Sequence, residues 1–219
     1  MPSLTVENYV KAIYQICFAQ SGRPAATGQI AAVLNVSPGT VTSMLKTLSE
    51  SGLATYTPYE GVRLTPAGSA LALRVVRRHR LIELFLVKTL DLTWDEVHEE
   101  AEHMEHAVSD RLVDRIDVYL EHPQFDPHGD PIPRADGSLE TPASRTLAQC
   151  PPGFRFRLAR VTNQSPEFLR FLTESGLPLG THGEVVANQA DASVMTVSAN
   201  GQTTELGREA AENILVAAP

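Results

Sequence analysis

The sequence predicts a mainly α-helical fold with small β parts, in three regions of different character. Apolar residues recur at helical spacing through the first half of the chain, whereas the last third is built of short alternating segments typical of strands. Charge is also uneven: residues 1–80 hold eight Lys/Arg against three Asp/Glu, and residues 81–140 hold four against sixteen. We expect a first domain over 1–73, a second over 74–140, a linker over 141–152 and a third domain over 153–219.

The overall composition, with 42% hydrophobic and 20% charged residues, is that of a globular protein. The sequence has no apolar N-terminal signal and no apolar run of about 18 residues, so we expect a cytoplasmic protein without a membrane partner. Cys17 and Cys150 are too few for a disulfide framework.

The N-terminal domain reads as three helices and a hairpin. TVENYVKAIYQIC has one apolar helical stripe, and TGQIAAVLNV is a short helix with Thr27 as its cap. A third helix follows a tight turn, with Ser37 at the N-cap, Pro38 at N1 and Gly52 past its end. LATYTPYEGVRLT then predicts two strands around a turn. This order is typical of a winged helix-turn-helix that binds double-stranded DNA, although an ordinary small helical domain would share the pattern.

The outward face of the third helix carries short hydroxyls and an ammonium, which can approach bases and phosphates closely. We predict that Lys46 and Arg63 bind phosphates and that Thr40 and Ser43 lie near bases. The full predicted set of DNA-contacting residues is Ser37, Thr40, Thr42, Ser43, Lys46, Thr47 and Arg63.

The central region begins with a long helix that Thr65 and Pro66 open, and TWDE is a capping box for the next helix. That helix holds HEEAEHMEH (98–106), and four of the chain's seven histidines fall between residues 79 and 106. At about 100° per residue, four potential ligands share an arc of about 100°, namely His98, Glu102, Glu105 and His106. His79 and Glu83, spaced i and i+4, share a face of the preceding helix.

Two such faces packed together would offer imidazole nitrogens and carboxylate oxygens, which suit Mn²⁺, Fe²⁺ and Zn²⁺. The alternative is a solvated acidic helix face. It accounts for Glu99 and Glu100, which lie off the arc, but not for the clustered histidines.

RHRLIELFL, VHEEAEHMEH and GDPIP, following a winged helix with SPGTVTSMLKTL, resemble the diphtheria toxin repressor and manganese transport regulator family of metal-activated transcriptional regulators. The resemblance runs in order over residues 4 to about 135 and continues faintly beyond. It implies an activating site of Glu102, Glu105 and His106 with a first-helix side chain, here Asn8. It also implies an ancillary site of His79, Glu83 and His98.

In this family, iron-type members have Met at the position of Asn8 and manganese-type members have Asp. At the position of Glu102, iron-type members have Cys, whereas manganese-type members share the Glu. A hard carboxylate in place of a soft thiolate favours Mn²⁺, with Fe²⁺ close behind. The resemblance therefore implies Mn²⁺ or Fe²⁺ at two sites per chain.

SDRLVDRIDVYLEHP predicts a helix capped by Ser109 and stopped by Pro123, which in the family helps to form a homodimer. RFRLARV, HGEVVANQ, SVMTVSANGQTTEL and NILVAA predict a small β-barrel, with a tight turn at Asn200-Gly201 and a capped helix at SPEFLRFLTESG. The barrel matches the SH3-like domain of longer family members. Two residues of that domain reach the ancillary metal, and the matching positions are Gln164 and Glu167.

We therefore predict a metal-activated regulator, with repression as the expected mode, that binds operator DNA and controls metal-uptake or homeostasis genes. A metal-independent winged-helix regulator is the alternative. A carboxylate-bridged dimetal enzyme is disfavoured because Glu-x-x-His occurs only at Glu100 to His103, off the arc. An HExxH hydrolase is excluded because Glu102 stands where the second His is needed, so no enzymatic activity is expected.

Overall fold

The structure, a computed structural model, describes residues 3–189 and 193–218. It divides into two compact units, which we treat separately. The first holds the chain up to His79 together with Glu105–Val108 and Pro133–Ser138. The second holds Arg80–Met104, Ser109–Ile132 and the chain from Leu139 onward.

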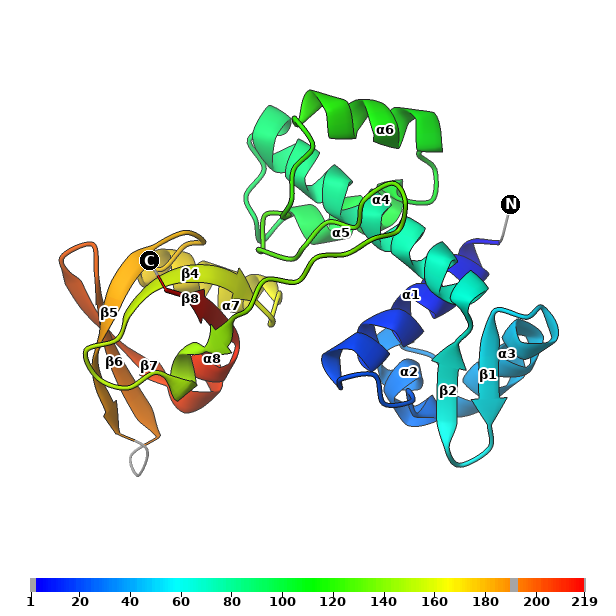
Figure 1. The fold of residues 1–219 in the computed structure, drawn as a ribbon, viewed down its shortest axis with the longest axis horizontal. Coiled ribbons are helices and arrows are strands. Elements are labelled where there is room, and N and C mark those ends of the chain that lie inside the picture. Colours follow the sequence, from blue (N-terminus) through cyan, green and yellow to red (C-terminus); the bar gives the residue numbers. More distant parts are fainter. Residues whose placement is uncertain (1–2, 190–192, 219) are drawn as a thin grey trace. The chain divides into compact units, whose positions relative to one another are not determined.

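The first unit contains the predicted winged helix-turn-helix (Figure 1). Its elements are α1 (Leu4–Ala19), α2 (Thr27–Leu34), α3 (Pro38–Glu50), β1 (Ala54–Thr57), β2 (Gly61–Leu64) and the start of α4 (Pro66–Leu90). The Ser37 hydroxyl accepts from Thr40 N, and Pro38 is at N1 of α3, both as predicted. Gly52 adopts φ 71° after α3. The Thr27 cap was wrong by one residue, because α2 begins at Thr27 and the Gln29 side chain accepts from Ala26 N.

One apolar core joins α1, α2, α3 and the wing of this unit. Val10, Ile13, Ile30, Leu45 and Val62 are each 0% exposed within it. The wing strands pair antiparallel from Ala54–Leu64 to Thr57–Gly61. Burial of one face of α3 in this core turns its polar face to the outside.

The second unit combines the rest of α4 with two further helices, α5 (Val97–Met104) and α6 (Asp110–Tyr119). Ser109 caps α6 as predicted, but α6 ends at Tyr119, and Glu121 and His122 take positive φ before Pro123. The Glu96 carboxylate accepts from the amide and hydroxyl of Thr93. The predicted cap positions were nevertheless wrong, because α5 begins at Val97 and both residues of this contact precede the helix.

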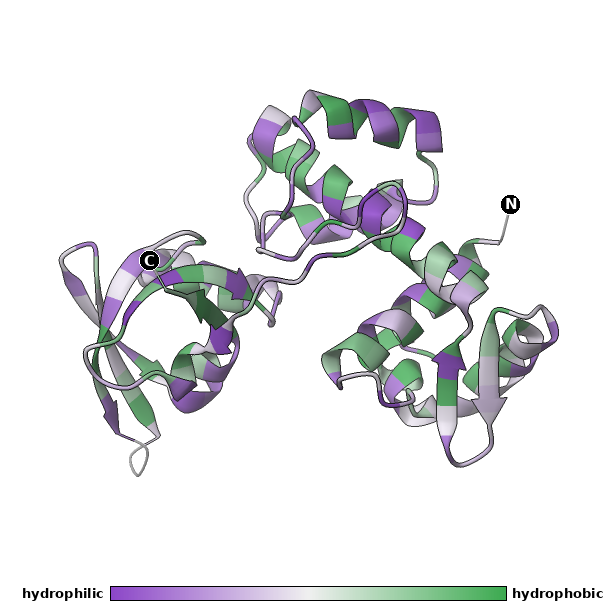
Figure 2. Cartoon of the chain, in the orientation of Figure 1, coloured by the Kyte–Doolittle hydropathy of each residue, from purple (hydrophilic) through white to green (hydrophobic). Residues whose placement is uncertain are grey.

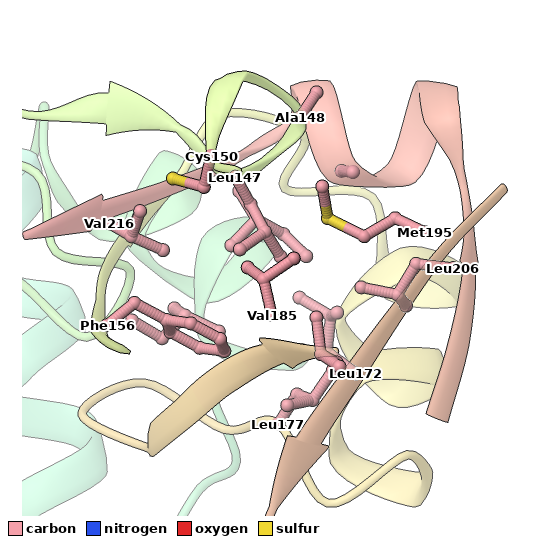
Figure 3. Packing of buried hydrophobic residues seen from close by; sticks show 14 of the residues in the cluster. Leu147, Ala148, Cys150, Phe156, Leu172, Leu177, Val185, Met195, Leu206 and Val216 are labelled. Carbon is pink, nitrogen blue, oxygen red and sulfur yellow. The ribbon is translucent and has the colours of Figure 1, made fainter. Parts of the chain in front are cut away.

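The C-terminal part of this unit is a six-stranded antiparallel sheet in the order β3-β8-β4-β5-β6-β7. Its elements are β3 (Arg145–Thr146), the 3₁₀ turn η1 (Leu147–Gln149), β4 (Arg155–Val161), α7 (Pro166–Glu174), β5 (His182–Gln189), β6 (Val194–Ala199), β7 (Gln202–Gly207), α8 (Arg208–Glu212) and β8 (Ile214–Ala217). Phe156, Leu172 and Val185 lie in its core (Figure 3). The predicted strands and the Asn200-Gly201 turn are confirmed, whereas β3, η1 and α8 were not predicted. Within the described residues, no helix is both long and apolar enough to cross a bilayer.

Candidate metal centres

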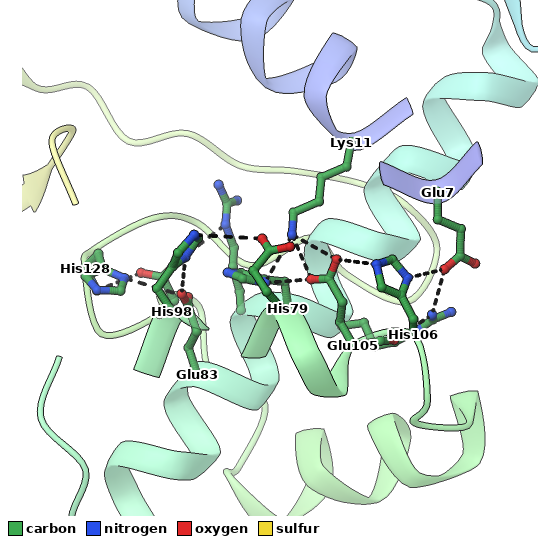
Figure 4. Close-up of polar contacts among 12 residues, drawn as sticks. Glu7, Lys11, His79, Glu83, His98, Glu105, His106 and His128 are labelled. Atoms are coloured by element: carbon green, nitrogen blue, oxygen red, sulfur yellow. Dashed lines mark hydrogen bonds and ion pairs between the residues drawn. The ribbon is translucent and has the colours of Figure 1, made fainter. Parts of the chain in front are cut away.

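The first unit buries a carboxylate at its centre, that of Glu105, which is 0% exposed (Figure 4). Lys11 from α1 places Nζ 2.9 Å from Oε1 and 2.8 Å from Oε2 of Glu105. His79 from α4 places Nδ1 2.6 Å from Oε2 of the same carboxylate and 3.2 Å from Lys11 Nζ. Burial alone raises the pKa of Glu105, but the His79 hydrogen bond and the Lys11 charge outweigh it and hold this pKa below its ordinary value.

A second pair of groups adjoins Glu105 in the same unit. His106 Nδ1 lies 2.8 Å from Oε2 of Glu7, and Arg78 Nη1 lies 3.5 Å from the same oxygen. Arg78 also donates to the backbone oxygen of Glu105 at 2.9 Å. These contacts hold α1, α4 and the 105–106 segment together.

Four buried side-chain polar atoms of this unit make no hydrogen bond within the described part of the chain: the hydroxyl oxygens of Tyr9 and Ser49, Oδ1 of Asn8 and Nε2 of His106. The last two belong to residues predicted as metal ligands. His106 Nε2 lies 3.2 Å from Oε1 of Glu105 without the geometry of a hydrogen bond. Leaving such atoms unpaired is costly, and a carboxylate, an imidazole and an amide oxygen are a hard, mixed donor set. The residues present therefore fit a divalent cation.

The second unit holds another buried group, formed by Glu83 of α4 with Asp126 and His128 of the loop after α6. One ligand atom from each lies within 4.8 Å of the others, and all three residues are buried. His98 Nδ1 from α5 lies 3.3 Å from Oε1 of Glu83 (Figure 4). Carboxylates and imidazoles again converge, and the chain contributes no thiol to either group: Cys17 donates to the Val62 carbonyl and Cys150 to that of Thr146.

The orientation of His128 suits it to metal binding. Its Nε2 lies 2.7 Å from the Trp94 carbonyl, which can only accept, so Nε2 carries a proton and Nδ1 faces Glu83 Oε2 at 3.7 Å. Burial lowers the pKa of His128, but the contacts with Glu83 and the Asp126 charge raise it to about 9. Burial and the charges of Asp130 and Glu83 raise the pKa of Asp126 to about 7. Three acidic groups packed this closely favour a bound positive charge.

The predicted ligands are distributed over both units of the chain. Asn8, His79, Glu105 and His106 belong to the first, and Glu83, His98, Glu102, Gln164 and Glu167 to the second. The predicted continuation of the helix through His106 was wrong, because α5 ends at Met104. Glu105 and His106 instead follow α5 in a turn, and Arg78 takes the Glu105 carbonyl that a longer helix would use.

The remaining predicted ligands have other neighbours. Glu102 is half-buried, and its carboxylate lies 3.8 Å from His98 Nε2. Gln164 donates to Asp130 at 2.8 Å. The Glu167 side chain is 80% exposed and lies 3.8 Å from Arg170.

Four residues of these groups were not predicted from the sequence: Glu7, Lys11, Asp126 and His128. The first two lie on the same helix as Asn8, but their roles depend on partners far along the chain. Asp126 and His128 precede GDPIP in an irregular loop, where the spacing of residues does not predict the direction of their side chains. The two carboxyls and two imidazoles of HPQFDPHGD (122–130) were the available signal.

The predicted DNA-contacting residues lie at the start and along the length of α3 and on β2. Ser37, Thr40, Ser43, Lys46, Thr47 and Arg63 are exposed, and Thr42 is half-buried. Thr42 and Thr47 donate their hydroxyls to carbonyls one turn earlier, those of Pro38 and Ser43. Arg63 donates to the Gly22 carbonyl. These residues include two cations and several hydroxyls, the groups that contact a polyanion such as DNA.

Three family descriptions match consecutive parts of the chain. Residues 1–62 match the iron dependent repressor N-terminal DNA binding domain, residues 65–134 match its metal binding and dimerisation domain, and residues 145–218 match the FeoA domain. An uncharacterised HTH-type transcriptional regulator of Methanocaldococcus jannaschii is 36% identical over 54% of this chain and 94% of its own length. The diphtheria toxin repressor of Corynebacterium efficiens is 28% identical over 97% of this chain and 94% of its own.

Solved structures agree over the full length. A manganese-dependent transcriptional repressor in complex with manganese has a TM-score of 0.89 at 41% identity, covering 98% of this chain and 100% of the other. The regulator ScaR with bound Zn²⁺ has a TM-score of 0.81 at 33% identity, with complete coverage of both chains. The chain therefore belongs to the iron-dependent repressor family of metal-dependent, DNA-binding transcriptional regulators, whose members include the diphtheria toxin repressors, and it is not an enzyme.

Proposed function

We propose that this regulator is a repressor activated by Mn²⁺, or alternatively by Fe²⁺, that controls metal-uptake or homeostasis genes. The observation that carries the proposal is the pair of buried oxygen- and nitrogen-donor groups, neither of which includes a thiol. Such donors favour Mn²⁺ and Fe²⁺ over ions that prefer sulfur. One solved relative, which covers 98% of this chain at 41% identity, is described as manganese-dependent.

Each unit would hold one ion. In the first, Glu105 and His106 would be ligands, with the Asn8 amide oxygen and His79 beside them. In the second, Glu83, His98 and His128 would be ligands, with Asp126 supplying a further carboxylate. A bound cation supplies the positive charge that these carboxylates otherwise draw from Lys11, Arg78 and Arg80. Glu102, Gln164 and Glu167 stay predicted ligands.

Regulation follows from how α1 is used in the first unit. One side of α1 carries Glu7 and Lys11 to the metal-binding residues, and another packs Val10 and Ile13 into the core that supports α3. Ligands drawn together around a cation would fix α1 and thereby favour one arrangement of the DNA-reading helix. Metal and operator would then increase each other's affinity by the same factor.

Homodimers are also part of the proposal. The region matching the dimerisation domain leaves Leu112 and Tyr119 of α6 exposed by 50% and 66%, seven residues apart on one face. Figure 2 shows hydrophobic and hydrophilic residues side by side along α6. An apolar stripe of this kind would be covered by a second copy, and a twofold dimer would present two α3 helices to two half-sites.

The experiment is an anaerobic calorimetric titration of metal-free protein with Mn²⁺. Wild type is expected to bind one ion in each unit, Glu105→Gln and Glu83→Gln are each expected to lose one, and Glu99→Gln, at an exposed position of α5, is the matched control. DNA duplexes selected from a random pool with Mn²⁺ present should then lose affinity when a chelator is added. Unchanged DNA affinity in chelator would establish the metal-independent regulator instead.

A further inference from the structure

The Lys11 ammonium is surrounded by the kinds of donor atom that usually bind a divalent metal ion. Its Nζ contacts both oxygens of Glu105 and lies 3.2 Å from the Nδ1 of His79. Two carboxylate oxygens and an imidazole nitrogen are the donors that a divalent metal ion takes from a protein. The residue is only 5% exposed, so water screens its charge little. Figure 4 shows its side chain reaching from α1 to the Glu105 carboxylate.

The ammonium and a divalent ion compete for the same carboxylate. Carboxylate lone pairs directed at Nζ are unavailable to a metal, and two cations on one buried carboxylate repel each other strongly. The unpaired atoms Nε2 of His106 and Oδ1 of Asn8 provide donors that Lys11 does not use. Glu105 therefore already contacts an ammonium, while the protein also offers further ligands suited to a metal ion.

We propose that Lys11 is an internal competitor of the metal ion, an inference that rests on the proposed function above. In the metal-free protein Lys11 neutralises Glu105, so the protein can fold around this buried carboxylate without a metal ion. When metal binds, Lys11 has to release Glu105, and this cost weakens the apparent affinity. Lys11 thus sets the metal concentration at which the regulator responds.

The position of Lys11 on α1 links this exchange to the DNA-binding domain. Glu7, one turn earlier on the same face of α1, already contacts His106 and Arg78. A carboxylate therefore lies one turn from the released ammonium. Neighbouring residues of α1 pack in the same core as α3. The release of Glu105 by Lys11 therefore takes place on the helix that supports α3.

Lys11→Met tests the proposal, since Met keeps the length of the side chain without its charge. We expect Lys11→Met to bind Mn²⁺ about tenfold or more tightly than wild type in calorimetry. Its thermal midpoint should fall in the metal-free form, where Glu105 loses its partner, and fall less when saturated with Mn²⁺. Lys88→Met, which removes an exposed ammonium from α4, should change neither quantity.

A purely structural ion pair gives a different pattern. In that case Lys11→Met binds Mn²⁺ no more tightly than wild type and loses equal thermal stability with and without metal, which overturns the proposal. If neither wild type nor Lys11→Met binds Mn²⁺, the proposed metal regulation is overturned, and with it the role of Lys11. If Lys11→Met does not fold, the ¹⁵N signal of the buried Lys11 ammonium in wild type decides. The signal should shift or vanish on saturation with diamagnetic Zn²⁺, and an unchanged signal contradicts displacement.

Discussion

Gly129 shows how a single residue fixes the position of one of the two candidate metal-binding groups. It follows His128 in the loop after α6, with φ at 83°, and a Cβ added there would lie 2.1 Å from the Ala159 carbonyl oxygen of β4. Its amide donates to Asp126 O, and Val161 N donates to His128 O. The loop that carries Asp126 and His128 therefore lies directly against β4, and the absence of a side chain at residue 129 is what allows it.

Gly129→Ala should distinguish the two proposed metal sites, because it should disturb only one of them. The added methyl must push the loop away from β4, so we expect a loss of about 1–3 kcal/mol in the free energy of unfolding, measured in urea. Calorimetry should show that the ion held by Glu83, Asp126 and His128 is weakened or lost while the ion at Glu105 is kept. Gly137→Ala is the matched control, because Gly137 has the same φ of 83° with nothing within 4 Å of the added Cβ. Equal metal binding by both variants would contradict this account of the loop.

At the scale of elements, α3 serves both the fold and recognition. Ser37 caps its own helix through Thr40 N and contacts the Thr40 hydroxyl at 2.9 Å, so two predicted DNA contacts are already engaged with each other. Lys46, in contrast, is exposed and stands on the outer face of the helix. We therefore regard Lys46 as the residue of α3 whose contribution to DNA binding can be measured with least disturbance of the fold.

Lys46→Ala should weaken DNA binding by a similar factor for every duplex tested, because an ammonium that meets a phosphate reads no sequence. The slope of log affinity against log salt should decrease by about 0.9 for each protomer. Fluorescence anisotropy over a salt series measures both quantities, with Lys88→Ala as the exposed-lysine control. A loss of affinity confined to one sequence would place Lys46 at a base edge instead.

Elements with their own local signals could be predicted from the sequence. The caps Ser37, Ser109 and Ser165 and the Asn200-Gly201 turn act through neighbouring residues, so they are legible without tertiary structure. By contrast, β3 is two residues long and exists only through its pairing with β8. The same distinction holds in the candidate metal centres. His79, Glu83, His98 and Glu102 show helical spacing, whereas Lys11 contacts Glu105, which is 94 residues further along the chain. No periodic pattern connects positions so far apart.

At the scale of the whole molecule, positive and negative charges are concentrated in different regions of the chain. The first 80 residues carry an excess of five positive charges and present α3 and the wing, while residues 81–140 carry an excess of twelve negative charges and supply most of the candidate ligands. A basic reading surface attracts a polyanion, and an acidic region attracts cations. A molecule that reads two half-sites would need two associated copies of the chain, and α6 is the element that we propose for this association.

Leu112→Glu should therefore convert the dimer to a monomer without unfolding the chain. Val113 and Ile116 anchor α6 internally at 5% and 6% exposure, while Leu112 is half exposed and free to meet a second copy. A carboxylate buried in an apolar contact would weaken association about tenfold or more, which sedimentation velocity would detect as a shift to the monomer mass. Val186→Glu, an equally exposed apolar residue of β5, is the control and should leave the mass unchanged. Because Leu112→Glu should lose dimerisation, its affinity for a duplex with two half-sites should also decrease, whereas Mn²⁺ binding at Glu105 should persist. If Leu112→Glu stays dimeric, another face of the molecule forms the contact.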